Sequence, residues 1–333
     1  MLIGADDGLI FPADADWDRA QQALTEAGFG DGLPLVVPTQ ARMQQMLAGV
    51  ADPGRSLGAM APLFGELTIE AIAYCCVLAG CKPAELPVVA TAAVATLADE
   101  FNLLGIQTTT GTPAVCVVVH GPTVGELGMN SATNCLGPGN RANACIGRAV
   151  HLVLTHIGGA RPDIADMATM GQPGKYIFCF AEGEHPLIPP LSRRRGIDAD
   201  TSAVTVIGVS GTLEVLPRQP ADSAELALLA ITDAMHGARL AYGAGRDRPA
   251  GEQFILIPPE IADLIQKRGW DLSRMQEFIL QNSPPSLSAA PWPLARSAND
   301  VNCILTGGAG IKMTCLAPWG GGTYSVTRPL LSI

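Results

Sequence analysis

The clearest alternation of apolar and polar positions lies in the middle of the chain. Apolar side chains recur at steps of three and four residues from Ile146 to Ile157, which is the spacing of one buried helix face. Asn140 is a preferred N-cap residue, and Gly158 ends a helix readily because glycine tolerates a left-handed backbone. The pattern therefore predicts a helix from about Arg141 to Gly158.

The patterns on either side of this helix differ in kind. Residues 1–100 carry mainly helical periodicity and predict an N-terminal arm followed by a helical pair. The helices expected there are 16–27, one capped by Thr39, 67–80 and 84–98. Residues 101–333 alternate β-rich apolar runs with helical patterns, which predicts an α/β body.

The α/β body is expected to hold a mixed sheet, or sheets, with flanking helices. The expected strands are 103–109, 114–120, 175–181, 203–209, 253–257 and 301–306, and the expected helices are 223–240, one beginning at 258–260, and 272–281. A Pro-, Ser- and Ala-rich stretch at 283–297 is typical of a linker. A further boundary near 183–200 would divide the body into two lobes with the site between them.

Composition narrows the class of protein. Hydrophobic residues make up 48% of the 333 positions and charged residues 16%, so much of the chain must be buried in itself or in a subunit interface, and we expect a homo-oligomer. The balance of 21 basic and 31 acidic residues disfavours nucleic acid and anionic membranes as partners. The only dense basic run, Arg193–Arg195, is typical of a solvated loop; the alternative is a lid over an anionic ligand.

Cysteine usage and hydropathy indicate a compartment. Nine cysteines without a leader-like N-terminus favour the reducing cytoplasm, and no apolar run is long enough to cross a bilayer. The chain has no Cys-x-x-Cys or His-Glu-x-x-His motif, and His151 and His156 point to different sides of their helix. We therefore expect neither a metal nor another cofactor.

A polar, Asn-rich segment before the central helix is the candidate substrate site. Asn130, Asn134 and Asn140 lie in it. The free amides and the positive dipole end of the helix can bind an anion together with Arg141. We expect these residues, with Arg148 further along the helix, to hold a small carboxylate-bearing substrate.

Two cysteines in this region are candidate nucleophiles. Arg141, Cys145 and Arg148 have the spacing of one helix face, so two guanidiniums would favour the thiolate of Cys145. Cys135 lies just upstream, in the loop that leads to the same helix end. The alternative is that both thiols are small buried hydrophobic groups, as free cysteines usually are.

Acid–base chemistry has candidates at the ends of two predicted strands. His120 ends strand 114–120, and Glu182 follows strand 175–181, with Glu184 close behind. Ligand sites in α/β folds lie at such carboxyl ends. The alternatives are a structural histidine and plain surface carboxylates.

The C-terminal part carries a second informative block. Strand 301–306 leads into Gly307-Gly308-Ala309-Gly310 and then Lys312. Glycine lets backbone amides approach a ligand, so Gly308, Gly310 and Lys312 are candidate substrate contacts opposite the Asn140 helix. A tight hairpin without a ligand is the alternative, because the block matches neither a Walker loop nor a dinucleotide-binding turn.

Blocks spread over nearly the full chain resemble an uncharacterised bacterial protein family. They are DGLPLVVPT at 31–39, Gly65–Glu70, Ala79–Pro83, Phe101–Leu103, Gly137–Arg148, Gly171–Ala181 and the endings Gly-Gly-Ala-Gly and Ser-Val-Thr-Arg-Pro. That family is associated with small proteins bearing a cysteine- or selenocysteine-Gly-Ser-Cys motif, the UGSC group. This chain lacks the motif, so its chemistry cannot be carried over to any residue here.

The resemblance changes the weight of the candidates. In the family pattern the position of Cys145 is often Thr and that of His120 often Asn, which implies that these residues are special to this protein or not catalytic. It raises Cys81 as a candidate. The recurring Asn, Arg and Gly positions imply an anion pocket by analogy.

Together these patterns predict a cytoplasmic enzyme acting on a small anionic metabolite. Cys135 or Cys145 would be the nucleophile, and His120 or Glu182 the proton carrier. Lyase, hydrolase and sulfur-transfer chemistry stay open. One alternative is a non-catalytic or scaffold subunit that binds a small thiol protein, and another is a metal-dependent enzyme.

Overall fold

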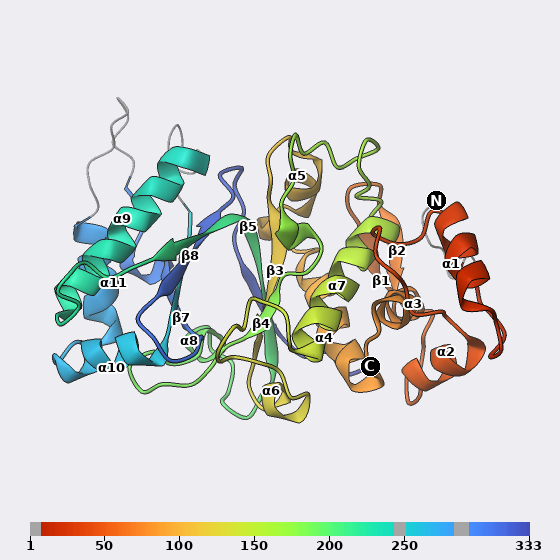
Figure 1. Cartoon of the computed structure of the whole chain (residues 1–333), viewed down its shortest axis with the longest axis horizontal. Coiled ribbons are helices and arrows are strands. Elements are labelled where there is room, and N and C mark those ends of the chain that lie inside the picture. Colours follow the sequence, from red (N-terminus) through yellow and green to blue (C-terminus); the bar gives the residue numbers. More distant parts are fainter. Residues whose placement is uncertain (1–7, 243–250, 283–292) are drawn as a thin grey trace.

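The structure is a computed structural model that describes residues 8–242, 251–282 and 293–333. It confirms an α/β fold in which a mixed seven-stranded sheet is flanked by helices. Figure 1 shows the sheet in the middle of an elongated molecule, with helices α1–α4 and α7 on one side and α9–α11 on the other. Most of the predicted linker 283–297 lies outside the described residues.

The N-terminal part is mainly helical, as expected. Its helices are α1 (Trp17–Glu26), α2 (Gln40–Met46), α3 (Ile69–Ala79) and α4 (Leu86–Ala95), and β1 (Ser56–Met60) and β2 (Gly65–Thr68) form a hairpin that the sequence patterns did not predict. The side chains of Asp16, Thr39 and Thr68 accept hydrogen bonds from first-turn amides of α1, α2 and α3. Each of these helices therefore starts at a local cap.

The large sheet has the order β4-β3-β5-β8-β6-β7, and β9 also pairs with β5. The strands are β3 (Ala114–His120), β4 (Cys179–Ala181), β5 (Ala203–Val215), β6 (Gln253–Ile257), β7 (Val301–Leu305), β8 (Met313–Pro318) and β9 (Val326–Pro329). β3 and β4 are parallel, as are β6 and β7, whereas the other pairs are antiparallel.

Helices connect and cover these strands. They are α5 (Leu103–Thr108), α6 (Thr123–Glu126), α7 (Arg141–His156), α8 (Leu191–Arg194), α9 (Ala224–Tyr242), α10 (Pro259–Lys267) and α11 (Leu272–Gln281). The start of α7 at Arg141 and the bounds of α11 confirm the predictions for those helices.

Two predicted strands were wrong in type or length. Residues 103–108 of the strand predicted at 103–109 form α5 instead, because the Asn102 side chain caps the helix by accepting the Gly105 amide at 3.2 Å. The strand expected at 175–181 is shortened to β4, since a 3₁₀ turn at Pro173–Lys175 precedes it.

The two halves of the large sheet repeat one strand pattern. In the first half, β3 is followed by a crossover through α7, the parallel edge strand β4 and the antiparallel strand β5. In the second half, β6 is followed by a crossover through α10 and α11, the parallel edge strand β7 and the antiparallel strand β8. The register between centre and edge strand also agrees in the two halves. Val117 of β3 pairs with Cys179 of β4, and Ile255 of β6 pairs with Cys303 of β7. β5 and β8 pair antiparallel in the centre, so an approximate two-fold axis relates the halves.

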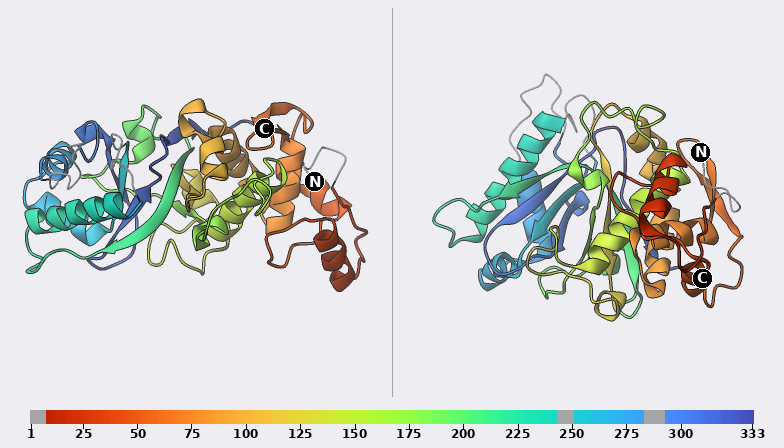
Figure 2. Two further views of the ribbon diagram at one scale, coloured as in Figure 1. Left: turned by 90° about the horizontal axis from the view of Figure 1, so that it is seen from above. Right: turned by 45° about the vertical axis from the view of Figure 1, so that its right-hand side comes forward.

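The sheet is curled, and each surface of it covers a different core. The outer surface of the first half packs on α3, α4 and α7, and that of the second half packs on α9, α10 and α11 (Figures 1 and 2). The concave surface has its own buried cluster, which includes Val118, Phe180, Phe254 and Ile304. The curl brings the edge strands β4 and β7 together, and the Gly183 amide, just after β4, donates to the Leu305 carbonyl at 2.8 Å.

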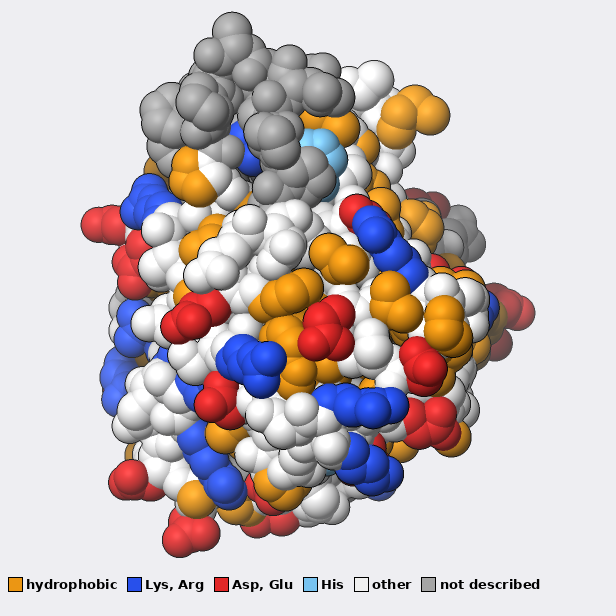
Figure 3. Space-filling model, turned by 90° about the vertical axis from the view of Figure 1, so that its left-hand side faces the viewer, with side chains coloured by type: hydrophobic (Ala, Val, Ile, Leu, Met, Phe, Trp, Pro, Cys, Tyr) orange, Lys and Arg blue, Asp and Glu red, His pale blue; other side chains and the backbone are white. Residues whose placement is uncertain are grey.

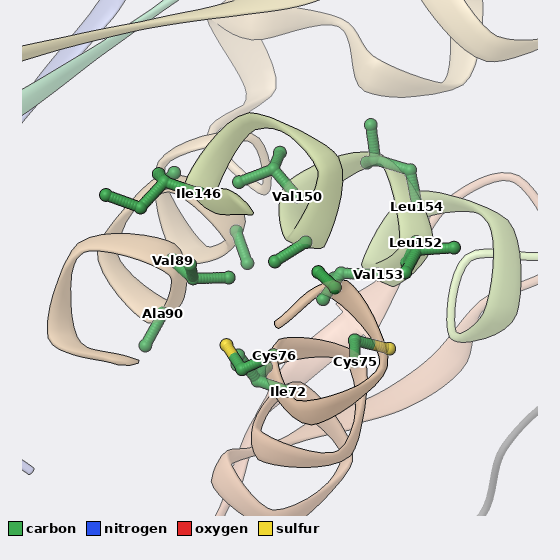
Figure 4. Close-up of a cluster of buried hydrophobic side chains, with 14 of the residues drawn as sticks. Ile72, Cys75, Cys76, Val89, Ala90, Ile146, Val150, Leu152, Val153 and Leu154 are labelled. Atoms are coloured by element: carbon green, nitrogen blue, oxygen red, sulfur yellow. The ribbon is translucent and has the colours of Figure 1, made fainter. Parts of the chain in front are cut away.

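Helices α3, α4 and α7 form the main helical core. Figure 4 shows Ile72, Val89, Ile146 and their neighbours meeting between the three helices, with Cys75 and Cys76 in the same cluster. Both cysteines are fully buried. These two thiols are therefore part of the hydrophobic core.

The outer surfaces carry charges of both signs. Figure 3 shows the side of α9–α11, where basic and acidic side chains are interspersed with apolar ones over the described part of that face. Among the described residues, no single helix is long and apolar enough to cross a membrane. The bent pair Pro83–Ala95 and Asp99–Thr108 meets the length and composition criteria together.

Buried polar contacts tie the N-terminal arm to α7. The Gly30 amide donates to Nε2 of His156 at 3.0 Å, and the Arg148 guanidinium makes two 2.8 Å hydrogen bonds to the Asp31 carboxylate. Burial, together with the nearby Arg161 charge, lowers the pKa of His156 to about 4. A neutral His156 is the form that can accept the Gly30 amide.

We expect the stability of the protein to fall as the pH is lowered from about 6.5 to 4. A histidine in the unfolded chain protonates near pH 6.5, whereas folded His156 does so near pH 4, so the unfolded state binds more protons in this window. The contribution is complete above about pH 6.5, and about 2 kcal/mol of it is lost by pH 5.

Urea unfolding at pH 7 and at pH 5 measures this loss. His156→Gln should reduce the difference between the two pH values, because it removes the group whose pKa is lowered on folding. An unchanged difference in His156→Gln would contradict the assignment.

Candidate functional site

The Asn-rich segment before α7 is a compact loop bonded to itself. Asn140 caps α7 as predicted, with its Oδ1 accepting the Asn143 amide at 3.0 Å and its Nδ2 donating to the Gly128 carbonyl at 2.8 Å. Asn134 Nδ2 donates to the Pro138 carbonyl at 2.7 Å. These side-chain amides therefore shape the loop.

Asn130 has the same structural role at the start of the loop. Its Oδ1 accepts the Ala132 amide at 2.8 Å, and its Nδ2 donates to the Thr133 carbonyl at 2.9 Å. The Asn143 side chain in turn bonds both the amide and the carbonyl of Asn130. Each of the three predicted Asn side chains uses one of its two N–H groups in these internal bonds, so at most one N–H of each could contact an anion.

The two arginines expected beside Cys145 are paired with carboxylates. Arg141 pairs with the buried Glu85, with one contact of 3.2 Å, and Arg148 pairs with Asp31. Burial raises the pKa of the Cys145 thiol, and the Arg141 charge offsets this only in part. The prediction that this environment favours a Cys145 thiolate is therefore wrong, because the spacing of the arginines did not reveal their acidic partners.

Cys135 lines a cavity beside the first turn of α7. The cavity has a volume of about 350 Å³, and its walls are the loop 135–139, Asn143 and Ala144 of α7, and residues 177–179 leading into β4. Cys135 is 7% exposed. A volume of this size accommodates a small metabolite.

A second thiol and a hydroxyl lie close to Cys135. Cys179 lines the same cavity, and burial raises the pKa of its thiol. The Thr306 hydroxyl, just after β7, lies 3.3 Å from the Cys135 sulfur and 3.0 Å from each of the Ser131 and Ala181 carbonyl oxygens. Sequence patterns identified neither Cys179 nor Thr306.

The segment after β7 meets the Asn-rich segment, but Lys312 does not take part. The Gly307 amide donates to the Ser131 carbonyl at 2.9 Å, and a Cβ on Gly308 would lie 2.0 Å from the Thr133 hydroxyl, so glycine is needed for this approach. Gly310 has a φ of +132° in the turn. Lys312 instead forms an exposed ion pair with Glu214 of β5, at 2.9 Å.

The two predicted proton carriers, far apart in sequence, are in direct contact. His120 Nδ1 lies 2.7 Å from Glu182 Oε2, and His120 Nε2 lies 2.7 Å from the Thr205 hydroxyl. Glu182 Oε2 also accepts the Leu191 amide at 2.8 Å, whereas its buried Oε1 has no hydrogen-bond partner in the described structure. The side chains of His120 and Glu182 are 0% and 1% exposed, so this chain is closed to solvent.

The chain continues along the concave surface to an ion pair. The Thr205 hydroxyl lies 2.8 Å from that of Thr327, which accepts from Arg195 at 2.8 Å, and Arg195 also donates to Glu252 at 2.6 Å. Burial lowers the pKa of Arg195, and Glu252 partly restores it. The expectation of a solvated run at Arg193–Arg195 is therefore wrong for Arg195. The sequence patterns did not identify Thr205, although a polar residue at an inward-facing position of a predicted strand could have indicated it.

Comparison of the chain with known proteins does not assign it to a family. No family model matches the chain, and no curated protein gives a significant match. Within the part of the chain that the structure describes, no group of three or more His, Cys, Asp or Glu side chains is arranged to hold a metal ion. The cavity at Cys135 and the residues around it are therefore the basis for a functional proposal.

We expect His120→Leu to destabilise the protein by about 3–5 kcal/mol, because it leaves the buried Glu182 carboxylate without its imidazole partner. Chemical denaturation measures the change. The double variant His120→Leu/Glu182→Leu should be more stable than the single variant, since it removes the unpaired charge as well. A double variant that is less stable by the sum of both single changes would contradict this.

Proposed function

We propose that this protein is an enzyme that acts on a small anionic metabolite, with Cys135 as the nucleophile. The observation that carries the proposal is the cavity of about 350 Å³ that Cys135 lines at the start of α7. Like most other cysteines, Cys135 belongs to a buried apolar cluster, but it also lines this cavity. Cys135 combines low exposure with access to a space of metabolite size.

The start of α7 supports negative charge in this cavity. α7 has 16 residues, and the cavity contacts Asn143 and Ala144 in its first turns. The positive end of the helix dipole favours a bound carboxylate or an oxygen that becomes negative during reaction. Because Arg141 and Arg148 are paired with carboxylates, the helix end supplies this stabilisation in place of an arginine clamp.

A balanced first step follows from this arrangement. The thiol loses its proton to solvent, the sulfur forms a bond to an electrophilic carbon, and the electron pair of a carbonyl moves onto its oxygen near the helix end. Hydrolysis can begin with such an adduct, because expulsion of the leaving group gives an acyl-enzyme that water then cleaves. The proposal therefore favours a hydrolase among the three reaction classes.

We expect Cys135 to react with iodoacetamide at neutral pH faster than Cys145. Cys135 is the more buried of the two, so accessibility alone predicts the opposite order. Because the raised pKa of Cys145 also slows that thiol, the diagnostic result is protection of Cys135 by small carboxylates. Rates for each cysteine are read by peptide mass spectrometry. Small carboxylates should slow the reaction of Cys135 and leave Cys145 unaffected.

Cys135→Ser and Cys145→Ser form the matched pair for activity measurements. Cys135→Ser should abolish turnover of any substrate found by screening small carboxylates, and Cys145→Ser should retain it. Faster labelling of Cys145 than of Cys135 would remove the basis for the proposal.

A second candidate function is a non-catalytic subunit that binds a protein partner. Exposed apolar side chains favour it: Leu136 and Ile177 at the cavity, and Met167 and Met170 in the segment between α7 and β4. Such a surface is typical of an interaction site. Turnover by the isolated chain favours the enzyme, whereas turnover that requires a purified thiol protein favours this alternative.

A further inference from the structure

Thr306 is the closest polar neighbour of the Cys135 sulfur with no role assigned so far. It follows β7 directly and is 3% exposed. Its hydroxyl lies 3.3 Å from the sulfur and 3.0 Å from each of two carbonyl oxygens, those of Ser131 and Ala181. A hydroxyl has one proton, so it can donate to only one of these three groups at a time.

Three acceptors compete for that proton. The Ser131 carbonyl also accepts the Gly307 amide at 2.9 Å, but a carbonyl oxygen has two lone pairs, so the Ser131 oxygen, the Ala181 oxygen and the sulfur are all possible acceptors. With Cys135 as a thiol, the hydroxyl can donate to one of the two carbonyl oxygens and accept from the S–H group. With Cys135 as a thiolate, the hydroxyl can turn and donate to the negative sulfur.

The backbone holds Thr306 in place for this role. Its amide donates to the Ile257 carbonyl at 3.1 Å, as the Glu182 amide donates to Val119 at 3.0 Å in the other half of the sheet. Thr306 and Glu182 therefore occupy equivalent positions after the two edge strands. The hydroxyl can rotate, but the residue is held at the contact between these strands.

We propose that Thr306 is a positioning residue for Cys135, whose hydroxyl stabilises the thiolate and holds the sulfur at the cavity. The inference rests on the proposed role of Cys135 as a nucleophile. In the step concerned, the S–H bond breaks, the proton passes to solvent, and the Thr306 O–H turns from a neighbouring carbonyl oxygen to the sulfur. No electrons are exchanged.

Thr306→Val and Thr306→Ser form the test in the full chain. Val keeps the branched shape and removes the hydroxyl, whereas Ser keeps the hydroxyl and removes the methyl group. The alkylation rate of Cys135 by iodoacetamide is measured from about pH 6 to pH 10. Thr306→Val should react about tenfold more slowly than wild type at pH 7, since a hydrogen bond to a charged group is lost, and should reach the wild-type rate near pH 10. Thr306→Ser should stay close to wild type throughout.

Two results would overturn the inference. One is wild-type behaviour of Thr306→Val at every pH, and the other is an equal loss at every pH, which indicates altered access to the sulfur. Thermal unfolding verifies that the variants are folded, and Thr306→Ala, which also lacks the hydroxyl, replaces Val if that variant does not fold.

The nucleophile assignment and the Thr306 inference can fail separately. Slow labelling of wild-type Cys135 relative to Cys145 counts against the assignment of Cys135 as the nucleophile. The ratio of variant to wild-type rates is still measured across the pH series, and its change between pH 7 and pH 10 decides the role of Thr306 independently.

Discussion

The contact between the carboxyl ends of β4 and β7 fixes the position of every group at the candidate site. At this contact the Gly183 amide donates to Leu305, and the Thr306 hydroxyl reaches Ala181. A buried backbone group left without a partner would cost about 1–3 kcal/mol, so the two edges are held in one register. The Asn-rich segment joins the same contact through Ser131, which places Cys135 beside Thr306.

The site is asymmetric although the sheet repeats one strand pattern. In the second half, α10 begins at Pro259, two residues after β6 ends. In the first half, residues 121–140 intervene between β3 and α7, and they supply the loop that forms the cavity. The equivalent edge positions have also diverged, with a carboxylate at Glu182 and a hydroxyl at Thr306. An extra segment and these two side chains thus distinguish the halves chemically.

Polar groups on the concave surface are arranged in two connected zones. The Glu182–His120–Thr205 chain is closed to solvent and leads to the Arg195–Glu252 ion pair, whereas the cavity at Cys135 is accessible to small molecules. A closed network of this kind is stabilised only while each charge keeps its partner. It is therefore best understood as a rigid, solvent-excluded part of the concave surface, and the proposed chemistry is assigned to the Cys135 thiol instead.

Local signals in the sequence determined most helices, including 272–281, because caps and apolar periodicity act within a few residues. The strand expected at 103–109 was wrong because the cap at Asn102 outweighed β-rich composition. The sequence also proposed Cys135, His120 and Glu182 as candidates, and the structure places Cys135 at a cavity and His120 in contact with Glu182. Only the tertiary structure decided their partners: Arg148 meets Asp31 across 117 positions, and Thr306 meets Cys135 across 171. Spacing along a chain carries no information about such distant pairs, since they form only when separate strands and helices pack.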